Sequence, residues 1–428
     1  NKETKDAKVL TVSNLSSTDT KAVPVAVKAT TTKQISFEDL KLPETLIKAI
    51  YGEMKWSVPA KVQMDALPLI MRSDRPNVRV QSKAGSGKTG VYALSMLNHA
   101  KETILKPQAI CMVHTRELAL QVADVTEKLG RYTQLKICRA VTESKREPVT
   151  QQIVVGTPGT IWNKIKYAEL SVDLITLLVV DEADAMLVQQ GLADQTMQIK
   201  QKLSAHANSS LQILLFSATF APATIKFADV FCPKSENLVV AREQIMLEGV
   251  RRLFVDAGEE SKKYEALLAV YALTKMGKSI IFTQTMKVAR ELTEKMQKDG
   301  YSVSLFIGDM TATQRDATMN NFRTGKTTVL IASNVLARGI DDKSVTLVVN
   351  YDVPMLQNGR PDPETYIHRI GRTGRYGRPG VAITFVHDNV SKQALATIAS
   401  LYNCAITQIP LDNLEEAEVV INAAVAQK

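Results

Sequence analysis

Short apolar runs alternate with amphipathic stretches along most of this chain, and they form two series. A short β-branched or leucine-rich run is typical of a strand buried on both faces, and the amphipathic stretches are typical of helical crossovers. A polar interval from Pro233 to Gly249 separates the two series. The pattern predicts an α/β protein of two lobes, each a mostly parallel sheet with helices on both faces. The predicted strands are 78–80, 109–113, 153–155, 177–180 and 211–216, then 252–255, 279–282, 303–306, 328–331, 345–349 and 382–386.

The pattern also sets the expected domain boundaries. Residues 1–34 are rich in Thr, Ser, Lys and Val and contain no aromatic residue, so we expect a flexible polar tail. From Phe37 onwards apolar residues recur at helical spacing, which marks the start of a folded body. The 428 residues exceed what one hydrophobic core usually covers. We expect a first lobe over 35–236, a linker over 237–249 and a second lobe over 250–428.

Composition narrows the class of protein. No stretch approaches the roughly 18 uninterrupted apolar residues of a membrane span, and the first residues lack a signal-peptide core. We therefore expect a soluble intracellular protein without membrane insertion. The four cysteines lie far apart with no paired spacing, which favours neither a zinc site nor a disulfide framework. A formal net charge of +9 favours an anionic partner such as nucleic acid.

The segment after the first predicted strand has the spacing of a phosphate loop. Its glycines let the backbone curl so that N–H groups face the β- and γ-phosphates of a nucleotide. Lys88 supplies a positive charge, and the Thr89 hydroxyl reaches a magnesium ion. Ser82 stands where the template usually begins with Gly or Ala, and it is small enough to fit. The loop reads Ser82, Lys83, Ala84, Gly85, Ser86, Gly87, Lys88, Thr89.

A second motif completes this site, because Asp181-Glu182-Ala183-Asp184 directly follows the apolar run 177–180. A carboxylate at the end of a buried strand suits hydrated magnesium, so we assign Asp181 to the metal and Glu182 to orienting a water. An acidic helix start would explain neither the paired acids nor the strand before them. The two motifs together predict a magnesium-nucleotide site.

The second lobe contains no phosphate loop and offers arginines instead. The run from His368 to Arg375 places three arginines three residues apart among glycines. Guanidinium groups from one helix start can approach a polyphosphate closely. We interpret this segment as the source of an arginine finger, which makes hydrolysis depend on closure of the two lobes.

Taken in order, these segments resemble the DEAD-box ATP-dependent RNA helicases over about residues 35 to 425. The resemblance implies two tandem RecA-like lobes and an RNA-stimulated ATPase that uses ATP and Mg²⁺. It also implies that Trp56 stacks on adenine and that the Gln63 amide reads the adenine edge, which explains a preference for ATP. In the second lobe, Gly339 and Asp341 would meet the ribose side of ATP, and Arg372 and Arg375 would be the arginine fingers that contact its phosphates.

The resemblance further assigns residues that couple ATP to RNA. Ser217 and Thr219, in contact with Asp184 and His368, would link ATP binding to unwinding. His114 replaces the proline that the family carries just before its first RNA-contacting segment. The RNA-binding residues implied are Thr115, Arg116, Thr157, Pro158, Gly159, Thr283, Arg315 and Ser333.

A long connection from Pro354 to Tyr366 resembles the branch of the family that works in messenger-RNA export at the cytoplasmic face of the nuclear pore. This likeness implies single-stranded RNA or messenger ribonucleoprotein as substrate, with nuclear-pore proteins and an accessory activator as partners. It also implies a monomer that resides in the cytoplasm and nucleus.

Three alternatives stay open on the sequence. They are a DEAD-box helicase of another branch such as translation initiation, an ATP-gated RNA clamp without net unwinding, and an ATP-driven DNA translocase with the same core. The long Pro354 to Tyr366 connection argues against translation initiation. For an RNA helicase, contacts to phosphates and 2′-hydroxyls predict little sequence preference and a salt-sensitive affinity.

Overall fold

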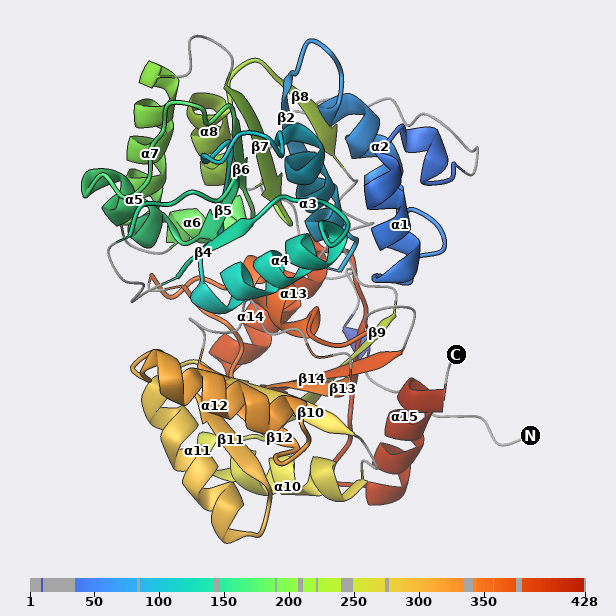
Figure 1. The fold of residues 1–428 in the computed structure, drawn as a ribbon. Helices are drawn as coiled ribbons and strands as arrows, with labels where there is room; N and C mark the ends of the chain where they lie inside the picture. Colours follow the sequence, from blue (N-terminus) through green and yellow to red (C-terminus); the bar gives the residue numbers. More distant parts are fainter. Residues whose placement is uncertain are drawn as a thin grey trace. The chain divides into compact units, whose positions relative to one another are not determined.

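The computed structural model divides the chain into two units, each built around one sheet (Figure 1). The amino-terminal lobe lies within Ala22–Ala241, and the carboxy-terminal lobe comprises Arg242–Lys428 together with Asn1–Lys21. The described residues are 9–10, 35–82, 85–141, 147–188, 191–206, 211–220, 222–239, 249–273, 277–333, 342, 344–356, 358–374 and 379–426.

The amino-terminal lobe contains a seven-stranded parallel sheet. Its elements are η2 (Glu38–Leu40), α1 (Glu44–Gly52), α2 (Lys61–Ile70), β2 (Asn77–Gln81), α3 (Lys88–His99), β3 (Ala109–Met112), α4 (Arg116–Leu129), β4 (Ile137–Ala140), β5 (Ile153–Gly156), α5 (Pro158–Lys166), β6 (Leu177–Val180), α6 (Ala183–Val188), α7 (Leu192–His206), β7 (Gln212–Ser217), α8 (Pro222–Phe231) and β8 (Ser235–Val239). The strand order is β4-β5-β3-β6-β7-β2-β8.

Successive residues of each strand face opposite helical layers, as the pleat requires. In β3, Ala109 and Cys111 pack in a core shared with α1 to α4, whereas Ile110 and Met112 pack in a core shared with α5 to α8. Figure 1 shows α5, α7 and α8 gathered on one side of this sheet. Because both faces are covered, the strands β5, β3 and β6 contain no polar side chain.

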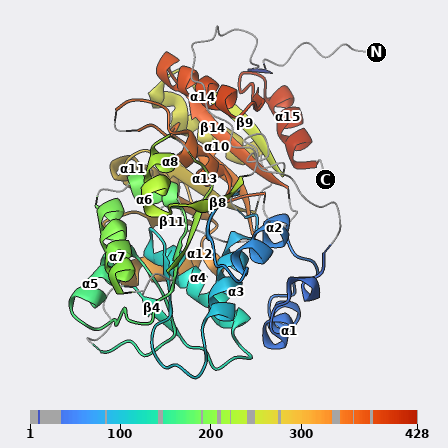
Figure 2. The ribbon, with the colours of Figure 1, turned by 90° about the horizontal axis from the view of Figure 1, so that it is seen from above.

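The carboxy-terminal lobe contains an eight-stranded sheet in the order β1-β15-β9-β14-β13-β10-β12-β11. Only the β1 pairing is antiparallel among the described strands, and Figure 2 shows β14 beside its neighbour β9. The helices α10, α11 and α15 share one core, and α12, α13 and α14 pack on the opposite face. The elements are β1 (Val9–Leu10), β9 (Val250–Asp256), η3 (Glu260–Lys262), α10 (Lys263–Leu273), β10 (Lys278–Thr283), α11 (Met286–Lys298), β11 (Val303–Phe306), α12 (Ala312–Arg323), β12 (Val329–Ser333), β13 (Val345–Asn350), α13 (Pro363–Ile370), β14 (Gly380–Val386), α14 (Asn389–Leu401), β15 (Ile406–Gln408) and α15 (Leu414–Ala426).

The predicted architecture of two mostly parallel, helix-covered sheets is confirmed. The strands that the pattern missed lie at or next to sheet edges: β1, β4, β8 and β15. An edge strand is exposed on one side, so it tolerates polar residues such as Arg139 of β4, which pairs with Glu127. Strand β8 also crosses position 236, where we expected the first lobe to end.

Two residues of the segment expected to be a flexible tail take part in the fold. Val9 and Leu10 pair with Thr407 and Ile406 of β15. The other residues of 1–34 lie outside the described part of the chain. Within the described residues, the helices are all too short or too polar to span a membrane.

His99 ends helix α3, and its Nε2 lies 2.9 Å from the Thr176 hydroxyl oxygen. Burial, helped by the positive charges of Arg75 and Lys101, lowers the pKa of His99 from 6.5 to about 4. Between about pH 6.5 and pH 4, His99 is therefore protonated in the unfolded chain and neutral in the folded lobe. The free energy of unfolding should therefore fall as the pH drops from about 6.5 towards 4. Above pH 6.5, His99 is neutral in both states and does not change it.

We expect His99→Gln to flatten this pH dependence, because glutamine keeps a polar partner for Thr176 but does not titrate. Both tryptophans, Trp56 and Trp162, lie in the amino-terminal lobe, so their fluorescence during urea unfolding reports on this lobe alone. The free energy of unfolding is measured for the wild-type protein and for His99→Gln, each at pH 7.5 and at pH 5. An equal loss of stability in the two proteins would show that His99 is not the group responsible.

Candidate functional site

The predicted site residues of the amino-terminal lobe follow five strands at one edge of the sheet. Along the strand order, Thr157 follows β5, Thr115 comes after β3, Asp181 follows β6, Ser217 ends β7 and Ser82 follows β2. Parallel strands bring their carboxyl ends to the same edge, so residues far apart in sequence lie side by side. The residues predicted to contact RNA occupy the β5-β3 half, and those predicted to contact ATP occupy the β6-β7-β2 half.

The phosphate loop is held at both ends. The Ser82 N–H donates to the Ser217 carbonyl at 3.1 Å, which ties the loop to the neighbouring strand β7. Gly87 has a φ of 100°, a conformation that favours glycine, and α3 begins directly after it. The buried Lys88 ammonium donates to the Ser82 carbonyl. The positive end of α3 and the Lys88 charge are thus placed for an anion. Lys83 and Ala84 lie outside the described residues.

The residues predicted to hold magnesium share one hydrogen-bonding partner. The Tyr92 hydroxyl lies 2.9 Å from Asp181 Oδ2 and 3.2 Å from Thr89 Oγ1. Burial raises the pKa of Asp181 to about 6, although the Lys88 charge acts in the opposite direction. A buried carboxylate that is hard to ionise alone suits a divalent cation, so these residues fit Mg²⁺. We missed Tyr92 in the sequence; its spacing of three residues after Thr89 on a helix was the available signal.

Glu182 is constrained through its main chain and through its side chain. Its φ of 51° is unusual for a residue with a side chain, and its N–H donates to Asp181 Oδ1 at 2.8 Å. Its carboxylate lies beside His114, with Nδ1 and Oε2 3.0 Å apart. Asp181 is buried, whereas the Glu182 side chain is partly exposed. Through its contact with His114, Glu182 faces the turn after β3.

The coupling residues of this lobe are in contact. The Thr219 hydroxyl donates to Asp184 Oδ2 at 3.1 Å, and the Ser217 hydroxyl donates to the Thr219 carbonyl at 2.6 Å. All three residues are buried. The expected pairing of Thr219 with Asp184 is therefore present. His368 is buried in α13 of the carboxy-terminal lobe.

Trp56 and Gln63 lie over the same turn of α3. Gln63 Nε2 donates to the Gly87 carbonyl at 3.4 Å, which joins the predicted adenine-reading segment to the phosphate loop. The Trp56 ring stacks on Phe37, with centroids 6.3 Å apart and planes inclined by 21°. A Cβ on Gly90 would lie 2.5 Å from Gln63 Nε2 and 2.8 Å from Trp56 Cη2. Phe37, which sequence reasoning treated only as the start of the fold, supports the tryptophan from behind.

The segments predicted to contact RNA in this lobe are strand-to-helix turns. Thr115 caps α4 by accepting a hydrogen bond from the Leu118 N–H at 3.3 Å, and Pro158 is the first residue of α5. Thr157 Oγ1 lies 3.1 Å from Thr160 Oγ1, and a Cβ on Gly159 would lie 3.2 Å from Gln195 Oε1. Helix capping accounts for Thr115 as it stands, so its role in RNA binding stays a prediction.

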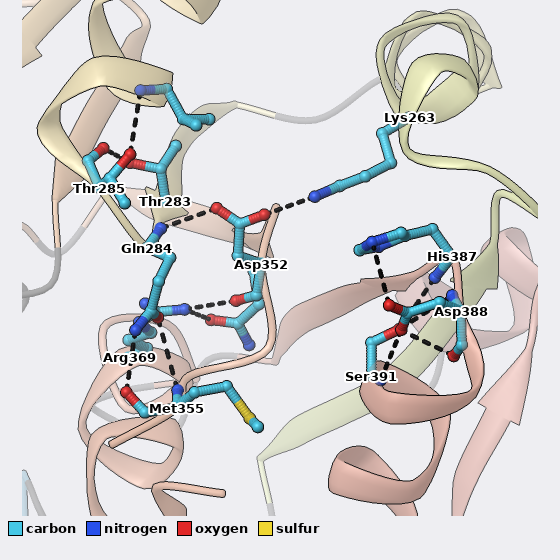
Figure 3. A network of polar contacts seen from close by, with 12 residues as sticks. Lys263, Thr283, Gln284, Thr285, Asp352, Met355, Arg369, His387, Asp388 and Ser391 are labelled. Carbon is cyan, nitrogen blue, oxygen red and sulfur yellow. Dashed lines mark hydrogen bonds and ion pairs between the residues drawn. The ribbon is translucent and has the colours of Figure 1, made fainter. Parts of the chain in front are cut away.

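In the carboxy-terminal lobe, a polar network fixes the segment that carries Thr283 (Figure 3). The Gln284 N–H donates to Asp352 Oδ2 at 2.7 Å, and Gln284 Nε2 donates to the Met355 carbonyl at 2.9 Å. The other oxygen of Asp352 pairs with the buried Lys263 ammonium. The ends of β10 and β13 are thereby locked together, with Thr283 buried at the start of the turn.

Arg369 anchors the same network from helix α13. Its Nη1 donates to Asn350 Oδ1 at 3.1 Å and to the Asp352 carbonyl at 2.8 Å, and its guanidinium lies 5.4 Å from the Phe282 ring centroid. Burial lowers the pKa of Arg369 to about 10. Arg369 is the first arginine of the run from His368 to Arg375. Its side chain positions the loop after β10 (Figure 3).

The other predicted residues of this lobe lie at both edges of the sheet, because Arg372 directly precedes Thr373, whose hydroxyl donates to the Val345 carbonyl at the start of β13. Arg315 Nη2 donates to the Gly308 carbonyl at 2.7 Å, and Ser333 is the buried last residue of β12. Arg372 is buried, and its Nε donates to the His368 carbonyl at 2.9 Å. Gly339, Asp341 and Arg375 lie outside the described residues.

A phosphate loop beside a buried strand-end carboxylate, in a chain of two parallel-sheet lobes, defines a nucleoside-triphosphatase of the two-lobed helicase class. The comparisons with known proteins agree. Residues 60–227 match the family model of the DEAD/DEAH box helicase, and residues 262–377 match that of the helicase conserved C-terminal domain.

Individual relatives are similar over nearly the whole chain. The ATP-dependent RNA helicase dbp5 of Schizosaccharomyces pombe is 44% identical over 391 residues, which are 91% of this chain and 77% of the relative. DBP5 of Saccharomyces cerevisiae is 40% identical over 389 residues, which are 90% of this chain and 80% of the relative.

Solved structures extend the likeness to three dimensions. Saccharomyces cerevisiae Dbp5 bound to RNA and ADP BeF3 has a TM-score of 0.87 at 40% identity, covering 91% of this chain and 99% of that one. A variant of the same helicase bound to Nup159, a Gle1 variant, IP6 and ADP has a TM-score of 0.65 at 37% identity, with 90% and 100% covered.

The chain belongs to the DEAD-box family and is an ATP-dependent RNA helicase, as its motifs indicated. Nucleotide binding follows from the same family membership.

Gly90 offers a test of the adenine pocket, because an added methyl group there meets Gln63 and Trp56. We expect Gly90→Ala to raise KM for ATP by about tenfold with a smaller effect on kcat, because the added methyl group disturbs ATP binding more than the chemical step. Gly52→Ala in α1 is the matched control, because its Cβ finds only Tyr132 at 3.7 Å. Steady-state ATPase assays measure both variants; equal KM values would contradict the assignment.

Proposed function

We propose that this helicase hydrolyses ATP in a composite site to which both lobes contribute. Lys88 of the phosphate loop and Arg372 and Arg375 of the second lobe cradle the γ-phosphate, and Glu182 orients the attacking water. For the amino-terminal half of this site, the supporting observation is the Tyr92 hydroxyl, which lies within hydrogen-bonding distance of both Asp181 and Thr89. The other ATP contacts are Trp56, Gln63, residues Ser82 to Thr89, Gly339 and Asp341.

Magnesium is the metal that this donor set favours. The Thr89 hydroxyl and the Asp181 carboxylate, the latter through water, would hold it, and the bound ion would neutralise charge on the phosphates. The chain's own contribution is to keep the Asp181 carboxylate buried and oriented by the Tyr92 hydroxyl and the Glu182 N–H.

RNA and ATP together draw the lobes shut in this proposal. Closure bends the bound strand, which disfavours a paired partner strand and displaces bound proteins, and phosphate release lets the lobes part. Ser217, Thr219, Asp184 and His368 couple the two events. The backbone of the RNA is held by Thr115, Arg116, Thr157, Pro158, Gly159, Thr283, Arg315 and Ser333.

The biological setting that we propose is messenger-RNA export. The support is the similarity to Dbp5 helicases and to a neighbour structure that contains Nup159, Gle1 and IP6. The expected partners are messenger ribonucleoprotein, nuclear-pore proteins and an accessory activator. We propose that the protein is a monomer of the cytoplasm and nucleus and that it acts at the cytoplasmic face of the nuclear pore.

Glu182→Gln tests the proposed role of the carboxylate. The amide keeps the size of the side chain but cannot act as a base, so we expect turnover to fall by about a hundredfold or more while ATP and RNA still bind. The assay measures ATP hydrolysis with single-stranded RNA, with single-stranded DNA and with neither, and duplex displacement in parallel.

Strong stimulation by RNA alone, with displacement of a short duplex, is the expected wild-type behaviour. Stimulation by DNA to the same level would favour a DNA translocase. RNA-stimulated hydrolysis without strand displacement would favour a clamp, and turnover independent of RNA would contradict the coupling.

A further inference from the structure

His114 stands at the boundary between the ATP half and the RNA half of the sheet edge. It comes after β3 and directly precedes Thr115, the cap of α4. The strands β3 and β6 are paired in register, with Met112 opposite Val180, and the Asp181 N–H donates to the Met112 carbonyl at 3.0 Å. The strand ends that carry the two halves of the site are therefore directly joined.

That register sets His114 opposite Glu182, because each residue lies two positions beyond the last paired residue of its strand. The imidazole Nδ1 and the carboxylate Oε2 are 3.0 Å apart. The His114 side chain is 0% exposed and that of Glu182 is 13% exposed. Electrostatic contacts to a carboxylate are stronger in such a poorly solvated place than in water.

The contact constrains both partners chemically. An ionised carboxylate only accepts hydrogen bonds, so the contact is favourable when the facing imidazole nitrogen carries a hydrogen. The His114 side chain thereby limits the direction of the Glu182 carboxylate, while the φ of 51° limits its main chain. A proline, which the family resemblance predicts at this position, could supply no such donor.

We propose that His114 is a positioning residue that holds the Glu182 carboxylate in place and transmits RNA binding to it. Arg116, predicted to face RNA, begins α4 two residues after His114. A shift of this turn on RNA binding moves the imidazole, and the carboxylate moves with it. Misplacing a reacting group by 1 Å can cost on the order of a hundredfold in rate. The inference rests on the proposed role of Glu182.

The test compares His114→Leu with His114→Asn in the 428-residue protein. Leucine fills the buried space without a donor, whereas the asparagine Nδ2 can take the place of the imidazole Nδ1. We expect His114→Leu to lower the RNA-stimulated kcat by about tenfold to a hundredfold, with KM for ATP and the Kd for RNA within about twofold of wild type. We expect His114→Asn to keep kcat within about threefold.

Unchanged kcat in His114→Leu would overturn the inference, and so would an equal fall in both variants, which would indicate packing alone. If His114→Leu does not unfold cooperatively, His114→Met replaces it in the same comparison. Glu182→Gln is assayed in parallel. Wild-type turnover of Glu182→Gln would refute the role of Glu182 itself, whereas an inactive Glu182→Gln beside a fully active His114→Leu would refute only the role of His114.

Discussion

The parallel register of the central strands in the amino-terminal sheet is the constraint on which the site depends. The strands β3, β6, β7 and β2 are neighbours, so the turns after them meet at one edge. Hydrogen bonds between the strand ends fix this arrangement, as in Ser82 N–H to the Ser217 carbonyl and Asp181 N–H to the Met112 carbonyl. A one-residue slip of β6 would turn the Asp181 side chain towards the opposite face of the sheet.

Burial at this edge gives the polar contacts their strength. Lys88, Asp181, Asp184 and Thr219 are all buried, and each has a polar partner within the lobe. In such a setting a hydrogen bond to a charged group is stronger than at the surface, and leaving the group without a partner is costly. The contacts within the lobe therefore hold these polar groups in defined positions.

Buried polar contacts also fix the strand ends of the carboxy-terminal lobe, through different residues. Asp352 joins Gln284, Lys263 and the turn after β13, and Arg369 closes the network from α13. Breaking one buried partner there would leave the others uncompensated, at a cost of about 3 to 5 kcal/mol. The network keeps Thr283 at a defined place on the sheet edge.

The sequence predicted the central strands and the ATP motifs because their signals are local: apolar runs for β3 and β6, and fixed spacing for Lys88 and Thr89. It could not predict β4 and β8, whose edge positions weaken the apolar signal. It also missed contacts that depend on tertiary placement. Tyr92 contacts Asp181 from a distant part of the chain, and Phe37 packs against Trp56 only once the segment between them has folded.

In the mechanism that we propose, ATP is hydrolysed only when arginines of the second lobe complete the site of the first. The most direct measurement is the RNA-stimulated kcat of Arg375→Ala, with Arg378→Ala as a control for the loss of one positive charge from the same segment. We expect kcat to fall about a thousandfold in Arg375→Ala and to stay near normal in Arg378→Ala. Unchanged turnover in Arg375→Ala would rule out this mechanism.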